Sequence, residues 1–233
     1  MLIMFSYNFL HHKTQDYIFY CHHYGIKIDA VIAADYVELN FPPKKYRYHI
    51  RRIGQIHPRD LCKQMDIPYY VAHHNSSEAL EILDSYSPDL GIISGARILK
   101  QKVIDKFNKG IINIHPGLIP ESRGLDTPHW SVYNDIPLGV TSHFIDKRVD
   151  AGWIIKKHFL PVYSDDTLID ISLRLYEGQL EILEETIQLA ISNPKESFPY
   201  VKYGEKKPYG IFPSDKEENL LIKLKDYTKK HAS

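Results

Sequence analysis

The sequence predicts an α/β fold, with a Rossmann-like and mostly parallel twisted sheet flanked by helices. Short apolar runs typical of buried strands alternate with longer segments whose apolar residues recur at helical spacing. Such an alternation requires crossover helices, and these crossovers place successive strands parallel. At 233 residues the chain can bury one sizeable core, so we expect one domain with a small extension.

The first half of the chain shows the alternation clearly. Strands are expected at residues 28–35, 67–73, 89–96 and 111–115, and helices from Pro58, at 76–86 and at 99–110. Pro58 suits the first turn of a helix, where its missing N–H is not needed. Ser76 or Ser77 can cap the second helix, and Gly110 is typical of a residue that closes a helix.

The pattern changes after Gly139. Residues 139–146 and 152–162 have the pattern of two longer strands, which could pair antiparallel at one side of the sheet. A long helix is expected from about Thr167 to Ile191.

Two prolines, Pro194 and Pro199, then mark a boundary. We expect a main domain of residues 1–193 and a short C-terminal extension of residues 194–233. Its aromatic, basic and turn residues predict a hairpin or loop followed by a terminal helix that packs against the body.

Composition disfavours several classes of protein. The 29 basic and 29 acidic residues balance, so bulk charge recommends neither nucleic acid nor an anionic membrane as partner. Cys21 and Cys62 are too few for a disulfide framework and wrongly spaced for a zinc ribbon or a redox pair. The N-terminus lacks a signal-peptide pattern, and no segment has the length of a membrane span. We expect a cytoplasmic protein.

The stretch INIHPGLIP places Asn113 and His115 where an expected strand ends in a loop rich in proline and glycine. Ligands of open parallel sheets bind outside the carboxyl ends of the strands. Further along, VDAGWII places Asp150 where a carboxylate can point into the same crevice. An amide, an imidazole and a carboxylate can together stabilise an oxyanion, orient an amine and accept its proton. A purely structural histidine at a strand end is the alternative.

The motifs INIHPGLIP, SRG and GVTSHFIDKRVDAGWII, in this order, resemble the formyltransferases that use N10-formyltetrahydrofolate. The resemblance covers roughly residues 75–190. It implies a formyltransferase with N10-formyltetrahydrofolate as co-substrate and with Asn113, His115 and Asp150 as its catalytic residues.

The same resemblance implies a folate site. SGARILK looks like the folate loop of the family, whose backbone receives the pterin around Arg97, Ile98 and Leu99. The opposite wall of the pocket is then formed by Ile145, Asp146 and Lys147.

Departures from the family pattern indicate the acceptor. A glycinamide ribonucleotide enzyme is expected to carry a glycine-rich phosphate loop after its first strand, where this chain has FSYNFLHHKTQDY. A methionyl-tRNA enzyme is expected to add a C-terminal barrel and a basic face. What remains resembles the enzymes that formylate nucleotide-linked amino-deoxy sugars, such as dTDP-4-amino-4,6-dideoxy sugars. That branch also suggests a homodimer in which the extension is a contact.

Other functions stay open at this point. The acceptor could be methionyl-tRNA or glycinamide ribonucleotide, or water in a formyltetrahydrofolate hydrolase, which would normally require an additional regulatory domain. A catalytically silent nucleotide-binding scaffold is a further class, and it is expected to have lost Asn113, His115 or Asp150, which are all present.

Several further residues are expected near the site. Tyr7 and Asn8 stand where the glycine-rich loop would lie and are expected to approach the sugar nucleotide. Arg123 and Gly124 are expected to shape the loop that admits the acceptor. For His143, a role in supporting the site and plain packing are equally open.

Three remaining features have ordinary explanations. Trp130 is expected in the core rather than against a ligand. The basic cluster between residues 37 and 55 favours a solvated loop over a phosphate-binding loop; it comprises Lys44, Lys45, Arg47, Arg51 and Arg52. The paired histidines lack partners at zinc-ligand spacing, so no metal is expected.

Overall fold

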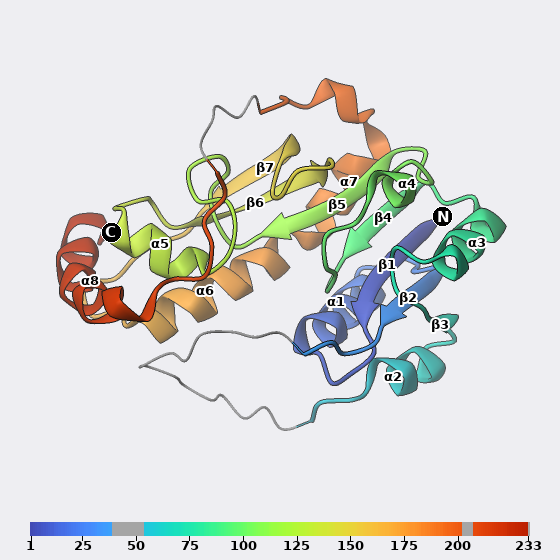
Figure 1. The fold of residues 1–233 in the computed structure, drawn as a ribbon, viewed down its shortest axis with the longest axis horizontal. Helices are drawn as coiled ribbons and strands as arrows, with labels where there is room; N and C mark the ends of the chain where they lie inside the picture. Colours follow the sequence, from blue (N-terminus) through green and yellow to red (C-terminus); the bar gives the residue numbers. More distant parts are fainter. Residues whose placement is uncertain (39–53, 202–206, 233) are drawn as a thin grey trace.

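The computed structural model has seven strands in one sheet, in the order β3-β2-β1-β4-β5-β6-β7 (Figure 1). It describes residues 1–38, 54–201 and 207–232. The strands are β1 (Leu2–Tyr7), β2 (Ala30–Ala34), β3 (Tyr69–Val71), β4 (Leu90–Ile93), β5 (Gly110–His115), β6 (Gly139–Ile145) and β7 (Gly152–Phe159). Strands β1 to β5 are parallel, and β6 and β7 continue the sheet antiparallel. The predicted α/β fold with a mostly parallel sheet is confirmed.

Helices cover both faces of this sheet. They are α1 (His12–His23), α2 (Pro58–Gln64), α3 (Ser77–Tyr86), α4 (Gln101–Ile104), α5 (Thr127–Tyr133), α6 (Leu168–Glu181), α7 (Leu183–Ser192) and α8 (Glu217–His231), with short 3-10 turns at Lys195–Ser197 and Ser214–Lys216. As predicted, Pro58 begins α2 and the Ser76 hydroxyl caps α3 by accepting the N–H of Ala79.

Two apolar cores lie on opposite faces of the sheet. In β1, Leu2 and Met4 face a core shared with α1, α2, α6 and α7, whereas Ile3 and Phe5 face a core shared with α3 and α4. Because both faces are covered, the central strands are mostly apolar, as in other buried parallel sheets.

The expected helix at 99–110 is much shorter in the structure. Only α4 is helical there, and Gly110 begins β5 with φ +112° instead of closing a helix. Phe107 is buried, and the amides of Asn108 and Lys109 donate to the carbonyls of the two residues before β4. These contacts draw the segment out of a helical path and toward the start of β5.

The expected helix at 167–191 is broken in two. Ile182 is buried and has φ −96° and ψ 2°, which lies outside helical geometry. Of the two halves, α6 packs on β6 and α7 packs on β7. The break lets each half follow a different strand of the twisted sheet.

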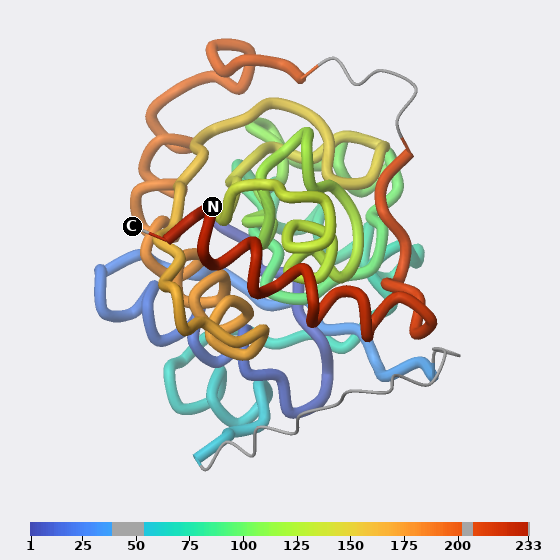
Figure 2. The backbone as a smooth tube through the Cα atoms, turned by 90° about the vertical axis from the view of Figure 1, so that its left-hand side faces the viewer, coloured from blue at the N-terminus to red at the C-terminus, as the bar shows by residue number. Residues whose placement is uncertain are grey.

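The C-terminal extension contains a loop and a helix, and its described residues form no hairpin. In Figure 2 α8 crosses the side of the molecule that faces the viewer, and it packs on α5. Leu220, Leu224 and Tyr227 of α8 join the larger core.

The strand order reverses between β1 and β4, which in open α/β sheets marks a crevice at the carboxyl ends of the strands. No helix formed by the described residues has the length and apolar character needed to cross a membrane.

Candidate active site

Polar side chains gather at the carboxyl end of β5. Asn113 and His115 are two residues apart and so lie on the same face of the sheet. In the ladder Asn113 pairs with His143 of β6, and His115 pairs with Thr141. The β6–β7 pairing shifts register between Ser142 and His143, and such irregularities re-aim side chains near functional sites.

Both ring nitrogens of His115 face acceptors. Nε2 lies 2.7 Å from the carbonyl oxygen of Ser122, and Nδ1 lies 3.4 Å from Oδ1 of Asp150. The residue is only 3% exposed. An imidazolium ring can donate to both oxygens, whereas a neutral ring can donate to one. The loop that contains Ser122 and the loop that contains Asp150 therefore hold the His115 ring in a single orientation.

Asp150 reaches His115 from the loop between β6 and β7. Its backbone is left-handed, with φ +44°, a conformation that Asp adopts more readily than most residues. Its Oδ2 accepts the N–H of Gly124 at 2.9 Å. Burial alone raises the pKa of this carboxyl, but the charge and hydrogen bond of His115 and the hydrogen bond from the Gly124 amide lower it to about 2. The carboxylate is thus ionised at neutral pH.

His143 orients the amide of Asn113. The Nδ1 of His143 lies 3.1 Å from the carbonyl oxygen of Ala151, which only accepts, so this nitrogen carries the hydrogen. Nε2 is then an acceptor, and Nδ2 of Asn113 lies 3.5 Å from it. Burial lowers the pKa of His143 to about 4, which keeps the ring neutral. One N–H of Asn113 is directed at His143, and the other is left for the cavity.

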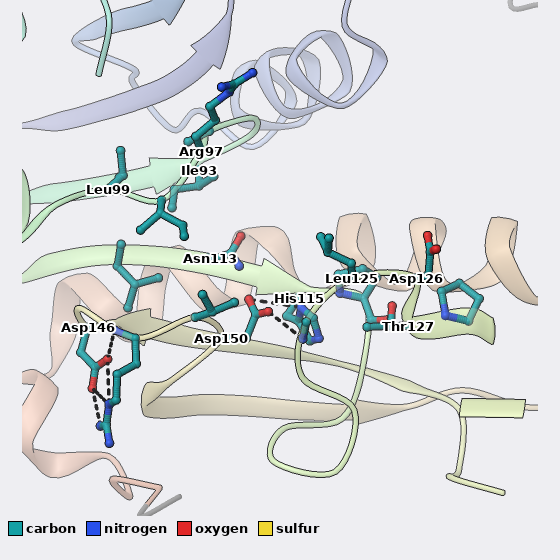
Figure 3. A pocket seen from close by; sticks show the side chains of 18 residues that line it. Ile93, Arg97, Leu99, Asn113, His115, Leu125, Asp126, Thr127, Asp146 and Asp150 are labelled. Atoms are coloured by element: carbon teal, nitrogen blue, oxygen red, sulfur yellow. Dashed lines mark hydrogen bonds and ion pairs between the residues drawn. The ribbon is translucent and has the colours of Figure 1, made fainter. Parts of the chain in front are cut away.

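A cavity of about 490 Å³ opens over these groups (Figure 3), and its lining includes all three predicted catalytic residues. The predicted folate residues Arg97, Ile98, Leu99, Ile145 and Asp146 also line it. Figure 3 shows Arg97 and Leu99 on one side of β5 and Asp146 on the other. The fold thus brings these two predicted walls to a single cavity.

Asn75 holds the loop at residues 97–100. Its Nδ2 donates to the carbonyl of Ile98 at 3.0 Å, and its Oδ1 accepts the N–H of Lys100 at 2.7 Å. Arg97 donates to the carbonyl of Val37 at 3.1 Å. Sequence reasoning missed Asn75 because an asparagine just before a helix cap has the appearance of an ordinary turn residue.

Four of the predicted folate- and acceptor-binding residues lie outside the lining of this cavity: Tyr7, Asn8, Lys147 and Arg123. Lys147 borders a neighbouring cavity of about 400 Å³. Asn8 donates to Oδ1 of Asp35 at 2.7 Å and accepts from Tyr69, and Tyr7 stacks on Phe9.

The basic cluster predicted between residues 37 and 55 lies outside the described residues; it comprises Lys44, Lys45, Arg47, Arg51 and Arg52.

Arg123 and Gly124 contact the loop that carries Asp150. Arg123 donates to the carbonyl of Val149 through Nε at 3.2 Å and Nη2 at 2.7 Å, and it is 7% exposed. Gly124 lines the cavity and donates to Asp150. Arg123 thus stands behind the carboxylate rather than in the cavity.

Lys13, near the start of α1, lies behind β5. Its Nζ donates to Oε1 of Gln179 at 2.8 Å and to the carbonyl of Ile114 at 3.4 Å. Burial lowers the pKa of Lys13 to about 8, although the charge of Asp150 opposes this shift. Lys13 belongs to no sequence motif, because only the fold brings it to Ile114, the residue between Asn113 and His115.

The site therefore combines an amide donor, an imidazole and an ionised carboxylate. Such a set can stabilise an oxyanion and move a proton. Within residues 1–38, 54–201 and 207–232, no three His, Cys, Asp or Glu side chains gather as metal ligands would.

Comparisons with known proteins return members of one family. The sequence pattern of the formyl transferase family matches residues 29–187. A methionyl-tRNA formyltransferase of Chlorobium chlorochromatii is 26% identical over 147 residues, which are 63% of this chain and 46% of the relative. A phosphoribosylglycinamide formyltransferase of Haemophilus influenzae is 32% identical over 131 residues, which are 52% of this chain and 62% of the relative.

The fold is also similar to that of solved structures. A sugar N-formyltransferase from a Shewanella species superposes with a TM-score of 0.62 at 17% identity, over 91% of this chain and 77% of the other. The chain spans less than two thirds of the length of either curated relative described above. The family match covers well over half of this chain and includes Asn113, His115 and Asp150. The chain belongs to the formyl transferase family.

Proposed function

We propose that this protein transfers a formyl group from N10-formyltetrahydrofolate to the amine of a nucleotide-linked amino-deoxy sugar, such as a dTDP-4-amino-4,6-dideoxy sugar. One observation carries the proposal: Asn113, His115 and Asp150 converge on one cavity in a chain of the formyl transferase family. Asp150 lies in the loop between β6 and β7, far along the chain from Asn113 and His115. Its position beside His115 is therefore a consequence of the fold.

The cavity suits a donor with a planar ring system. Ile93, Leu99 and Ile145 provide apolar walls, and residues 97–99 line the cavity from a loop that Asn75 fixes. Apolar walls with a few fixed polar groups are the usual lining of such sites. When bound, N10-formyltetrahydrofolate supplies the formyl group, and residues 97–99 with Ile145 and Asp146 would hold its pterin.

Asn113 and His115 would donate to the formyl oxygen as negative charge develops on it. Asn113 has one N–H directed toward His143 and a second available to the substrate. The Nε2 of His115 bonds Ser122, so the N–H that reaches the substrate would be the one on Nδ1, shared between the formyl oxygen and the Asp150 carboxylate 3.4 Å away. In enzymes of known mechanism, removal of one such donor raises the barrier by about 2.7–4 kcal/mol.

Asp150 would handle the proton. Its carboxylate is ionised and lies beside Nδ1 of His115. It can hold the ring in place and accept a proton from the attacking amine, directly or through water. The transferred formyl group forms a new amide bond as its bond to N10 breaks, and the leaving nitrogen recovers the proton.

The surroundings of the cavity support a sugar nucleotide as acceptor. The segment between β1 and α1 carries Phe9, stacked on Tyr7 with 5.0 Å between ring centroids, where a phosphate loop would carry glycines. Aromatic faces of this kind suit a nucleobase. A sugar N-formyltransferase shares this fold over 91% of this chain, so the fold is compatible with that acceptor.

A panel of acceptors tests the proposal. The protein is incubated with N10-formyltetrahydrofolate and, in separate reactions, with dTDP-, UDP- and GDP-linked amino sugars, glycinamide ribonucleotide and methionyl-tRNA. Mass spectrometry should show one added formyl group on an amino-sugar nucleotide, and none with the Asp150→Asn protein. Formylation of only the ribonucleotide or the tRNA would reject the sugar acceptor, and release of formate without any formylated product would indicate a hydrolase.

A further inference from the structure

The C-terminal extension pairs with the loop that contacts Asp150. Tyr209 donates its N–H to the carbonyl of Arg123 at 2.8 Å and accepts the N–H of Leu125 at 2.9 Å, which forms a parallel bridge opposite Gly124. In Figure 1 the red segment before α8 descends beside this loop. Tyr209 in the segment 207–212 thus pairs, as one strand residue would, with residues 123–125, which lie outside the seven-stranded sheet.

Aromatic packing fixes this bridge. The ring of Tyr209 stacks on Trp130 with 4.7 Å between centroids, and Phe212 meets the same indole edge-on at 4.7 Å. Nε1 of Trp130 donates to the carbonyl of Gly210 at 2.8 Å, and the N–H of Phe212 donates to Asp126 at 2.8 Å. Phe212 is 1% exposed. Trp130 was expected in the core, and the structure uses it to anchor the extension.

Gly124, which forms the bridge with Tyr209, also donates to the Asp150 carboxylate. Gly124 has φ +106°, and a Cβ at this position would lie 2.1 Å from the carbonyl oxygen of Tyr209. Only glycine permits so close an approach. In this conformation the N–H of Gly124 points at Oδ2 of Asp150, while Arg123 holds the carbonyl of Val149. The bridge therefore aligns the one amide of this loop that donates to the Asp150 carboxylate, and it lies next to the arginine that holds the carbonyl of Val149.

We propose that residues 207–212 are a positioning element of the active site, which aims the Gly124 amide and thereby fixes the Asp150 carboxylate against His115. This inference rests on the proposed function in one respect, since it takes Asp150 to act in formyl transfer. The family match ends at residue 187, so the element lies outside the part of the chain that defines the family.

Two variants of the extension test the element, and a third serves as control. Tyr209→Pro removes the N–H that donates to Arg123, and Phe212→Ala removes the buried anchor. Leu224→Ala is a matched truncation in α8, where the side chain is 9% exposed and packs in the same core without taking part in the bridge. Far-UV circular dichroism verifies that each variant is folded, and Phe212→Leu replaces Phe212→Ala if the latter is not.

The first measurement needs no acceptor. Amide hydrogen exchange at Gly124 and the nitrogen-15 shifts of the His115 ring are recorded by NMR on the free protein. We expect Gly124 to lose protection and the His115 signals to move in both bridge variants, and to stay as in the wild type in Leu224→Ala. Unchanged Gly124 protection in Tyr209→Pro would overturn the proposal, whatever the acceptor proves to be.

The second measurement is formyl transfer to whichever acceptor of the panel is active. Because small misplacement of catalytic groups can lower a rate about 10²-fold, kcat should fall by about that factor in the bridge variants, with KM for the donor within about threefold. Loss of donor binding with an unchanged kcat would contradict a positioning role. If no acceptor is active, the exchange and NMR data still decide the inference, so its failure and that of the proposed function are distinguishable.

Discussion

At the scale of single residues, the amide of Asn113 is the clearest candidate for an oxyanion donor. Asn113→Ala should lower kcat about 10²- to 10³-fold, because one donor to the developing charge is lost. The affinity for the donor, measured by calorimetry, should change little, since the walls of the cavity remain. Asn108→Ala, an exposed change of the same kind, provides the control. Equal kcat in the two variants would remove Asn113 from the mechanism.

The depressed pKa of Asp150 has a consequence for acid stability. A carboxyl whose pKa falls from 3.8 to about 2 on folding contributes stability above pH 3.8, and that contribution is lost as the pH falls through the folded value. The shift corresponds to about 2 kcal/mol. Urea unfolding should therefore show a gap of that order between wild type and Asp150→Asn at pH 6, which narrows between about pH 4 and pH 2.

The exposed Asp165→Asn variant controls for the loss of a negative charge. A gap between wild type and Asp150→Asn that stays constant down to pH 2 would show that the carboxylate gains nothing from His115 on folding.

At the scale of elements, α6 begins with a complete capping box. The Thr167 hydroxyl accepts the N–H of Asp170, and the Asp170 carboxylate accepts the N–H of Thr167. Thr167→Ala should lower the free energy of unfolding by about 1 kcal/mol, because an amide in the first turn loses its partner. Thr167→Ser, which keeps the hydroxyl, should retain most of the stability that Thr167→Ala loses. Chemical denaturation measures both, and a fall in kcat without loss of stability would contradict a purely structural cap.

The β6–β7 connection shows why one element of the site was harder to predict in detail. The sequence indicates two strands around VDAG and so places Asp150 between them. The left-handed backbone of Asp150 and the bonds from Gly124 and Arg123 depend on a loop and an extension distant in the chain. Local sequence pattern contains no information about such contacts.

At the scale of the whole molecule, three histidines with lowered pKa values make the free energy of unfolding depend on pH. Burial is the main cause that lowers the pKa of His11, His74 and His143 to about 4. The unfolded chain binds protons at these residues below about pH 6.5, while the folded chain does not until about pH 4. The free energy of unfolding should therefore fall as the pH drops from 6.5 to 4, and these residues should add no slope above that window.

His74 offers a test away from the cavity. Its Nε2 lies 2.9 Å from the carbonyl of Ser6, and the residue is 3% exposed. His74→Gln should remove up to about 3 kcal/mol of the pH-dependent change between pH 6.5 and 4, whereas the exposed His23→Gln should leave the slope as in the wild type. Urea unfolding at pH 7, 5.5 and 4.5 measures both, and identical slopes would contradict the role of burial.

The sequence by itself determined the fold class, the antiparallel pair at one edge and the family, because these follow from local periodicity and from motifs that lie within short stretches. It also placed Asn113 and His115 on one face, since strand geometry fixes the direction of residues two apart. Only the tertiary structure decided which residues from other parts of the chain lie around Asn113 and His115. Lys13, Asn75 and the bridge from Tyr209 to Gly124 join parts of the chain that no local pattern connects. The shortened α4 and the break at Ile182 have the same cause, since helices end where packing and hydrogen bonds to distant backbone outweigh local helical preference.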